Sequence, residues 1–454
     1  MTANVGIVGA GWAGLALAHH LHRAGLEVAV IEASPLAGGR ARDARLSLAG
    51  RSMSLDNGQH LMIGAYRETL GLLAELHEGE LPLRRLPLQF ESAGFGLRRR
   101  GPGLLGLATG LLMARGLSIG DRAALIRFGL ALAAHRWRGY EGRTVGELLN
   151  STGQSATLVA RFWRPFCLAA LNTPPADACA QTFVNVLHDS MLLDPRGSDF
   201  LIPTVSLGRL LAEPLLSSLR ARGVAVHQPW PVRAIERGDD TGWCVSGTGA
   251  RQALQFDFLA LACTARASAR LLSQASPAAA RSLNGFGYHE IRTAYLAWPK
   301  QPNVDLPGIR MLDDDGASAP GQWLFDRGVI DDLRIASVVI SASDQLVDTP
   351  DDALAAALVG QLGEQLALPA PLDLQWLRER RATFACRPER PKAQPDGIDG
   401  HTLPAGVFLC GDYCSSRYPA TLEGALLSAR ACAAAITAAA ATLSRSRPVP
   451  VGCP

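Results

Sequence analysis

The first thirty residues follow the order strand, glycine-rich turn, helix, strand. Val5–Val8 is a short apolar run, and Gly9-Ala10-Gly11-Trp12-Ala13-Gly14 comes directly after it. Apolar positions at helical spacing continue to Arg23, and Gly25 is typical of a helix end. Leu26–Ile31 then alternates as a second strand. The pattern therefore predicts a glycine-rich turn that lies between a strand and the start of a helix.

Helical and strand-like segments alternate through the rest of the chain. Apolar spacing predicts helices over 69–134 (with a glycine-rich break at 94–106), 144–171, 207–222, 353–366 and 421–443. Short apolar runs predict strands at 224–227, 232–236, 243–246, 256–263, 294–298, 335–340 and 407–410. We find no internal repeat and no low-complexity linker, and we expect disorder only in a short tail after Ser444.

Composition and charge narrow the class of protein. The 454 residues correspond to about three domain-sized modules. Apolar residues make up 48% and charged residues 19%, so a large core is easily built and wholesale disorder is excluded. Lys and Arg total 44 against 41 Asp and Glu. This balance argues against nucleic acid as the main partner, because phosphate binding usually leaves a clear basic excess.

Cysteine usage and the longest apolar stretches indicate the compartment. The nine cysteines form no CxxC pair and no cluster with histidine, so we expect reduced thiols and no metal site. An apolar run already starts at Val5, so no signal peptide is expected. The longest apolar stretches, 103–114 and 431–443, have 12 and 13 residues, whereas a spanning helix needs about 20. The sequence predicts a cytoplasmic protein that is soluble or peripheral to a membrane.

The glycine-rich turn has the spacing of a dinucleotide-binding motif. Gly9 allows the tight turn, Gly11 lets the backbone approach a pyrophosphate, and Gly14 lets helix and strand pack closely. The N-terminus of the following helix offers free N–H groups to phosphate. Glu32 ends the second strand, where its carboxylate can accept hydrogen bonds from ribose hydroxyls. Strand, helix and acidic residue are in register, so we favour a dinucleotide over a simple glycine turn.

Two further segments suggest which dinucleotide binds. Gly38-Gly39-Arg40 can bring backbone and a guanidinium group to a second phosphate or to a flavin edge, although a glycine loop with a solvated arginine is an alternative. Near the end of the chain, strand 407–410 meets Gly411-Asp412, and 420–425 opens a helix. Asp412 can accept from a polyol hydroxyl there, and it lies too far before the helix to be its cap.

Together these motifs resemble the flavin amine oxidase and phytoene desaturase superfamily. Within it, the more specific segments are similar to the hydroxysqualene dehydroxylases, the squalene-associated FAD enzymes of bacterial hopanoid biosynthesis. Those segments are Gly9–Leu15, Asp56–His60, Ile63–Tyr66, Leu171–Pro175 and Tyr418–Ala425. The resemblance covers the whole chain and is densest near its two ends.

The resemblance implies an α/β fold with two parts. A glutathione-reductase-like FAD-binding Rossmann domain would be discontinuous, with residues 1–65, 200–285 and 375–454, and an inserted α+β substrate domain would hold 66–199 and 286–374. We expect non-covalent FAD, although Cys410 and Cys414 flank Gly411-Asp412. The residues expected to bind FAD are Gly9, Gly11, Trp12, Ala13, Gly14, Glu32, Ala33, Gly39, Arg40, Asn57, Gly58, Gln59, His60, Val232 (through its backbone, against adenine), Gly411, Asp412, Thr421, Leu422 and Glu423.

The resemblance also implies a reductive reaction, in which hydroxysqualene loses an allylic hydroxyl and gains a hydride from reduced flavin to give squalene. Such an isoprenoid needs a long apolar cavity, which 103–137 and 161–171 can supply, although core packing explains most of those side chains equally well. Loss of the hydroxyl needs a proton donor or hydrogen bonds. His60 and Tyr66 are the candidates for this catalytic role, and His60 fits a bond to the backbone or to FAD at least as well.

An insoluble substrate favours collection at a bilayer, and one segment fits that role. Arg98–Arg100 precedes the apolar stretch 103–114, and Arg115 closes it, as in a helix that lies in a membrane interface. The alternative is a solvated arginine turn ahead of a buried helix. The prediction is peripheral attachment to the inner face of the plasma membrane.

Three other functions stay open at this stage. A carotenoid-type desaturase or an amine oxidase would use the same FAD site with the opposite direction of hydride transfer. Amine oxidases usually keep a flavin-facing lysine, and the lysines here, Lys300 and Lys392, lie in no motif. The third is a non-catalytic flavin- or lipid-binding protein that presents isoprenoids to a cyclase. The ribitol and pyrophosphate motifs argue against it, and turnover by the reduced flavin would exclude it. The electron donor is unknown, because Gly247-Thr248-Gly249 lies in a turn between strands and no second dinucleotide motif follows a strand.

Overall fold

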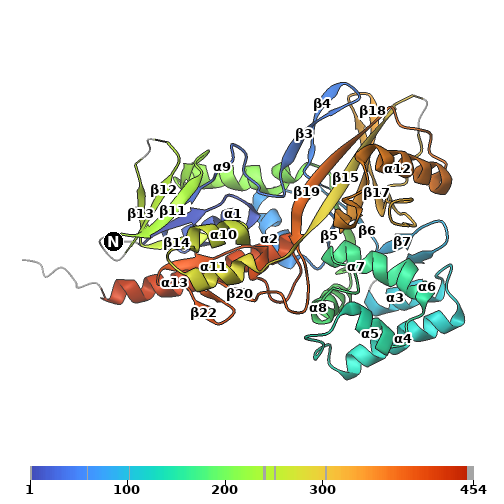
Figure 1. Cartoon of the computed structure of the whole chain (residues 1–454), viewed down its shortest axis with the longest axis horizontal. Coiled ribbons are helices and arrows are strands. Elements are labelled where there is room, and N and C mark those ends of the chain that lie inside the picture. The colour runs from blue at the N-terminus through green and yellow to red at the C-terminus, as the bar shows by residue number, and fades with distance from the viewer. Residues whose placement is uncertain are drawn as a thin grey trace, which may run out of the picture.

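A five-stranded parallel sheet lies at the centre of one half of the molecule (Figure 1). The structure is a computed structural model that describes residues 3–58, 60–101, 103–238, 242–249, 252–301 and 304–446. The sheet order is β10-β2-β1-β14-β23, and all neighbouring strands are parallel. The strands are β1 (Asn4–Val8), β2 (Glu27–Ile31), β10 (Ala225–His227), β14 (Phe258–Leu261) and β23 (Val407–Leu409). Because they come from the start, middle and end of the chain, this parallel-sheet half is discontinuous in sequence.

Helices α1 (Trp12–Arg23), α9 (Glu213–Ala221) and α13 (Leu422–Ser446) pack on this sheet and share one apolar core with it. By length and composition alone, α13 could cross a membrane over Leu422–Leu443. Its face with Leu426, Ala429 and Ile436 is nevertheless buried in the core beside α1. The helix therefore has the packing of a core helix of this half. A three-stranded antiparallel sheet, β11 (Val232–Arg237), β12 (Trp243–Gly247) and β13 (Leu254–Phe256), and helices α10 (Ala265–Leu272) and α11 (Pro277–Asn284) complete it.

A five-stranded antiparallel sheet organises the other half. Its order is β16-β17-β18-β15-β19, with β16 (Ile309–Met311), β17 (Trp323–Ile330), β18 (Leu333–Ser341), β15 (Tyr288–Pro299) and β19 (Asp373–Phe384). Leu324 and Trp298 face α12 (Asp351–Leu366) on one side of the sheet. Trp323 and Phe325 on the other side join a core with the helical segment of residues 103–191. We call the sheet, α12 and this helical segment the antiparallel-sheet half.

The helical segment consists of α3 (Gly103–Leu112), α4 (Ile119–Ala134), α5 (Val145–Ser151), α6 (Ala156–Leu158), α7 (Arg164–Leu171) and α8 (Ala180–Met191). Helix α7 ends at Asn172, which adopts a left-handed conformation with φ of 47°. The Asn172 side chain donates to Thr383 Oγ1 at 2.9 Å and accepts from Ala342 N at 2.7 Å. The Leu171–Pro175 segment therefore joins the helices to the sheet.

The helix expected over 69–134 is wrong in its middle. Helix α2 spans Arg67–Leu76, and strands β6 (Leu83–Leu86), β7 (Gln89–Glu91) and β8 (Gly96–Arg98) follow. Strand β6 pairs with β9 (Phe200–Pro203), so a partner more than a hundred residues away decides its conformation. The predicted domain boundary at 375 is also misplaced, because β19 belongs to the antiparallel sheet. The sequence patterns did not predict the strands β3 (Asp43–Leu48), β4 (Arg51–Asp56), β5 (Met62–Ile63), β20 (Ala393–Gln394), β21 (Gly397–Ile398) and β22 (His401–Thr402).

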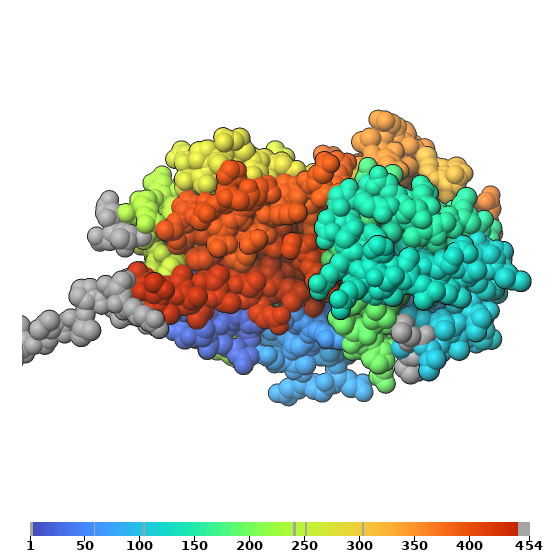
Figure 2. Space-filling model, turned by 90° about the horizontal axis from the view of Figure 1, so that it is seen from below, coloured from blue at the N-terminus to red at the C-terminus, as the bar shows by residue number. Residues whose placement is uncertain are grey.

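Figure 2 shows that the two halves meet along a continuous face, where the C-terminal segment (orange and red) lies against the helical segment (green and cyan). Buried contacts also join the halves elsewhere. The hydroxyl of Tyr295 on β15 donates to the Asp56 carbonyl at 2.8 Å, and Arg327 donates to the Asp56 carboxylate at 2.9 Å. Asp56 ends β4 and directly precedes the Asn57–His60 segment, so the antiparallel sheet helps to position that segment.

Candidate functional site

The turn between β1 and α1 needs glycine for steric reasons at two of the three glycine positions of its motif. Gly9 has φ of 116°, and a Cβ atom there would lie 2.5 Å from the Ala262 carbonyl oxygen. A Cβ atom on Gly14 would lie 2.0 Å from the Gly9 carbonyl oxygen. At Gly11 the nearest atom to such a Cβ is 3.8 Å away, so its absence leaves open space beside the backbone. No side chain caps α1 and no acidic residue lies in its first turn, so its first N–H groups are free for an anion.

Glu32 connects the two loops beside this turn. One carboxylate oxygen accepts from Ala10 N at 2.7 Å, and the other accepts from Ser34 N at 2.7 Å. Each oxygen keeps a second lone pair, which can accept a ribose hydroxyl. The exposed Ala33 lies between these contacts. The backbone N–H of Trp230 donates to the Glu32 carbonyl at 2.7 Å, so the segment that leads to Val232 is held beside the same carboxylate.

The second glycine loop lies directly against the first. Gly38 N donates to the Ala10 carbonyl at 2.8 Å, and a Cβ atom on Gly39 would lie 3.2 Å from Gly11 Cα. Gly38 and Gly39 have φ of 109° and 63°, a region that favours glycine. The two loops therefore form one backbone surface at the N-terminus of α1.

Arg40 and Asp412 bring opposite ends of the chain together. Arg40 Nη2 lies 2.6 Å from Asp412 Oδ2, and Nη1 donates to the Ala382 carbonyl at 2.7 Å. The other Asp412 oxygen accepts from Tyr413 N at 3.1 Å, and Gly411 N donates to Ser428 Oγ at 2.9 Å. Arg40 therefore supplies a fixed guanidinium group and Asp412 a fixed carboxylate, both next to the glycine loops.

Asn57, Gly58 and His60 follow β4 at the junction of the two halves, and Gln59 lies outside the described residues. Asn57 Nδ2 donates to the Arg40 carbonyl at 3.3 Å and to Glu379 at 3.1 Å. Burial, together with the nearby charge of Arg40, lowers the pKa of His60 to about 4. The residue is nevertheless only half-buried, so part of the ring stays accessible. His60 is neutral at physiological pH.

The start of α13 faces Tyr66 and the start of α2. The Tyr66 hydroxyl shares a hydrogen bond with Thr421, and burial raises the pKa of Tyr66. Thr421 Oγ1 accepts from Gly424 N at 3.0 Å, which leaves the Leu422 N–H at the helix start without this cap. The Glu423 carboxylate accepts from Glu68 N, Thr69 N and Thr69 Oγ1 at 2.8–2.9 Å. The Glu423 side chain therefore caps α2, and the backbone at the start of α13 is available for a cofactor.

Comparison with known proteins identifies the family. The model of the family described as "Flavin containing amine oxidoreductase" matches residues 12–437. The hydroxysqualene dehydroxylase of Rhodopseudomonas palustris is 30% identical, and the alignment covers 97% of this chain and 99% of that protein. The chain belongs to the flavin-containing amine oxidoreductases, in the hydroxysqualene dehydroxylase family. It is an FAD-dependent oxidoreductase.

Other members of the superfamily are more distant. A protein of Synechococcus elongatus named "Probable zeta-carotene desaturase" is 23% identical, over 96% of this chain and 99% of its own length. The solved structure of cyclohexylamine oxidase from Brevibacterium oxydans superposes with a TM-score of 0.68 at 16% identity, over 98% of this chain and all of that one. This structural likeness confirms the fold that the sequence predicted, an FAD-binding Rossmann domain with a second domain.

The residues of the glycine loops fit the FAD that this family binds. The free N–H groups at α1, the open space at Gly11 and the adjacent guanidinium of Arg40 suit a pyrophosphate, and Glu32 suits a ribose. Trp12 Nε1 is buried and has no hydrogen-bond partner among the described residues, so the start of α1 also offers an indole N–H donor to a ligand. Val232 is the first residue of β11, and its carbonyl accepts from Arg270 Nη2 at 3.3 Å.

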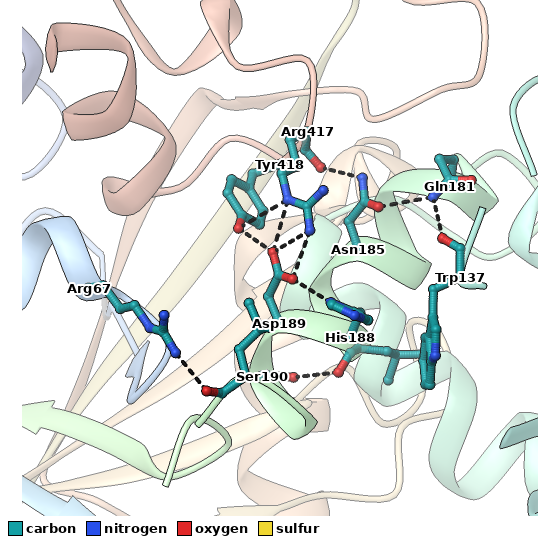
Figure 3. A network of polar contacts seen from close by, with 11 residues as sticks. Arg67, Trp137, Gln181, Asn185, His188, Asp189, Ser190, Arg417 and Tyr418 are labelled. Carbon is teal, nitrogen blue, oxygen red and sulfur yellow. Dashed lines mark hydrogen bonds and ion pairs between the residues drawn. The ribbon is translucent and has the colours of Figure 1, made fainter. Parts of the chain in front are cut away.

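A polar network around Asp189 was not found by sequence reasoning (Figure 3). Asp189 on α8 accepts two bonds from Arg417 Nη2 at 2.8 Å, one from the Tyr418 hydroxyl, and one from His188 Nδ1 at 2.7 Å. Asn185 Nδ2 donates to the Arg417 carbonyl at 3.0 Å. These bonds hold the loop just before Thr421 and Leu422 against the antiparallel-sheet half. Only the spatial pairing of residues 228 positions apart reveals the network.

Proposed function

We propose that this enzyme removes the hydroxyl group of hydroxysqualene to give squalene. The observation that carries the proposal is the 30% sequence identity, over 97% of this chain, with a hydroxysqualene dehydroxylase. The contacts of Glu32 and of Arg40 with Asp412, which suit FAD, support it. Reduced FAD supplies a hydride at N5. The balanced reaction consumes the alcohol, one hydride and one proton, and it yields the hydrocarbon and water.

We infer that FAD is held without a covalent bond. Covalent attachment through sulfur needs a reactive thiolate. Burial raises the pKa of Cys414 well above its usual value, and burial raises that of Cys263 to about 11. Both thiols are protonated at neutral pH and are therefore poor nucleophiles. Acid precipitation of the enzyme should release the yellow colour into the supernatant, and colour that stays with the pellet would contradict this inference.

An aromatic cluster lies next to the segment that carries His60 and Tyr66. Phe90 is surrounded by Phe162, Phe166, Phe200 and Trp323, with ring centroids 5.3–6.2 Å apart. Phe200 pairs with Ile63 through β9 and β5, which connects the cluster to the loop between His60 and Tyr66. We propose that the isoprenoid reacts beside this cluster, where aromatic faces stabilise an allylic cation and water is excluded.

Of the two predicted catalytic residues, Tyr66 suits the leaving hydroxyl better. Burial raises the pKa of Tyr66, so it keeps its proton and can donate a hydrogen bond at neutral pH. His60, with its pKa lowered to about 4, is not a ready proton donor, although its neutral ring can hydrogen-bond the flavin or the substrate. We assign Tyr66 the hydrogen bond to the hydroxyl, and His60 a positioning role.

The amine oxidase alternative receives little support from the lysines. Lys300 is exposed at the end of β15, and its ammonium lies 3.4 Å from Asp332. Lys392 is exposed before β20. The face of β15 toward Gly58 carries Thr293, whose hydroxyl lies 3.8 Å from the position of a Gly58 Cβ atom. No lysine among the described residues therefore lies at this junction. The desaturase alternative is decided by the direction of hydride transfer, which needs a measurement.

One anaerobic experiment separates these functions. The purified enzyme is reduced with light and mixed with hydroxysqualene, the return of oxidised flavin is followed, and the lipid is extracted. We expect one squalene for each flavin reoxidised. A flavin that stays reduced with hydroxysqualene but is reoxidised by oxygen would contradict the dehydroxylase proposal and favour a desaturase or an oxidase.

We also propose peripheral membrane attachment through α3 and α4. Six large apolar side chains are exposed on or beside these helices, among them Leu105 at 82% and Ile119 at 85% exposure; the others are Leu112, Met113, Ile126 and Leu130. Arg98, Arg100 and Arg115 are exposed nearby, where they suit anionic headgroups. Arg99, which the sequence placed with them, is instead buried and paired with Asp199.

Co-sedimentation with vesicles that contain phosphatidylglycerol tests this surface. We expect the wild type to sediment at low salt and the double variant Leu105→Glu, Ile119→Glu to stay in solution. Leu372→Glu is the matched control, because Leu372 is 60% exposed on a different part of the chain. A wild type that stays in solution would disprove the attachment.

A further inference from the structure

A positively charged groove lies between α10, α11 and β19. Its volume is about 700 Å³, which is within the range of small-molecule sites. Four arginines line it, Arg266 and Arg270 from α10, Arg281 from α11 and Arg381 from β19. Thr264, Ser273 and Asn284 add polar groups, and no acidic residue contributes to the lining. The groove therefore offers hydrogen-bond donors with positive charge, and no carboxylate in its lining offsets that charge.

None of these four arginines forms an ion pair within the described residues. Arg270 donates to the Val232 carbonyl, and the structure shows no hydrogen bond from the side chains of Arg266, Arg281 or Arg381 to other described residues. By contrast, Arg378 on the same strand is paired with Glu290 at 3.3 Å. Four like charges along one groove repel each other, so an anion that bridges them would be stabilising.

A smaller cavity of about 190 Å³ continues the groove. It shares Arg266, Asn284 and Arg381 with the larger one and adds the aromatic rings of Phe286 and Tyr288. An aromatic wall next to guanidinium groups is suited to a flat heterocycle that carries phosphates. The combination distinguishes this groove from a purely charged surface.

We propose that the groove binds a nucleoside diphosphate, with the diphosphate on the four arginines and the base against Phe286 and Tyr288. The residues that line the groove do not include Gly11, Glu32 or Arg40, although Tyr288 lies close enough to Arg40 and Asp412 to interact with them electrostatically. The groove therefore adjoins the region proposed for FAD, and the test uses FAD-loaded enzyme for this reason. The proposal does not depend on the proposed dehydroxylation. A bilayer is the weaker explanation, because α10 and α11 lie in the other half of the molecule from α3 and α4 (Figure 1).

Calorimetric titration of the FAD-loaded enzyme with ADP and with inorganic pyrophosphate tests the proposal. We expect one ADP per chain, tighter binding of ADP than of pyrophosphate, and weaker binding at high salt. Arg281→Ala and Arg381→Ala should each weaken ADP binding at least about tenfold, the loss of one charge-assisted contact. Arg380→Ala is the matched control, because Arg380 is an exposed arginine next to Arg381 that does not line the groove.

Three results would overturn the proposal. ADP binding that occurs only in FAD-free enzyme would show that the nucleotide enters the flavin site. Equal binding by the wild type and by Arg281→Ala would show that the groove is not involved. No ADP binding, but sedimentation with phosphatidylglycerol vesicles that is lost in Arg281→Ala, would assign the arginines to lipid headgroups. All of these readouts are independent of dehydroxylase activity, so failure of that activity would leave them unaffected.

Discussion

The region proposed for FAD and the region proposed for the substrate are built in different ways. In the region proposed for FAD, backbone groups form most of the surface. The glycine loops and the N-terminus of α1 approach each other at distances that no side chain would allow. In the antiparallel-sheet half, side chains form the corresponding contacts, as in the aromatic cluster around Phe90 and the network around Asp189. A site made of backbone geometry tolerates few substitutions, whereas one made of packed side chains can change its shape between relatives.

The largest effects are expected for two substitutions in the glycine turn, one that should impair both folding and FAD binding and one that should impair FAD binding alone. In Gly14→Ala the new methyl group would overlap the Gly9 carbonyl, so we expect a loss of about 3 kcal/mol in the free energy of unfolding as well as loss of FAD. In Gly11→Ala the methyl group has room in the protein, and φ of −70° suits alanine. We therefore expect an FAD-free protein with near-normal stability and at least about hundredfold weaker FAD binding.

Urea unfolding of the FAD-free proteins and titration with FAD would measure the two effects. If Gly11→Ala binds FAD as the wild type does, then the pyrophosphate does not approach the backbone at this turn. That result would remove the main difference between the two regions.

The same difference explains what the sequence could and could not predict. The parallel-sheet half was predicted well because its motifs are local: Gly9, Gly11 and Gly14 with Glu32, and Gly411 with Asp412, each lie within one strand–turn–helix segment. The strands β6 and β19 were not predicted, because pairing with distant strands decides their conformation. The sequence motif predicted Glu423 as a cofactor-binding residue, but it did not reveal that the Glu423 carboxylate caps α2, because the two are 354 residues apart in the chain.

The next effect concerns the junction of the two halves at Asp189. Asp189→Ala removes a buried carboxylate that holds Arg417, Tyr418 and His188, and we expect a loss of about 2 kcal/mol in the free energy of unfolding. The loss is moderate because Arg417 is half-exposed and can be hydrated. Since the network positions the loop before Thr421, FAD binding should weaken as well.

Urea unfolding and FAD titration measure both quantities, with Asp177→Ala as the control because Asp177 is exposed in the same half. Unchanged FAD affinity in a destabilised Asp189→Ala would show that the network stabilises the junction without positioning the FAD site. The coupling between the two regions would then be weaker than the geometry indicates.

A smaller effect should appear in the pH dependence of stability. The pKa of His60 is about 4 in the folded protein and about 6.5 in the unfolded chain, so the unfolded chain binds more protons between these values. Stability therefore falls as the pH drops from about 6.5 to 4. In His60→Gln this fall should be smaller by about 1 kcal/mol, less than the full shift implies because the ring is partly accessible. Urea unfolding of FAD-free protein at several pH values measures it, and identical pH profiles would place His60 in a more solvated site.

The smallest effect is expected at Lys300, which lies in the antiparallel-sheet half but away from its junction with the FAD site. Its ion pair with Asp332 is exposed on both sides, and such pairs contribute less than about 1 kcal/mol. Lys300→Met should therefore change neither the free energy of unfolding nor the rate of squalene formation within error. Its neighbour in the ion pair provides the control, because Asp332→Ala removes the same contact while the lysine stays. If Lys300→Met abolishes squalene formation while Asp332→Ala does not, the lysine itself acts in the dehydroxylation, and its exposed position in the structure would not account for that role.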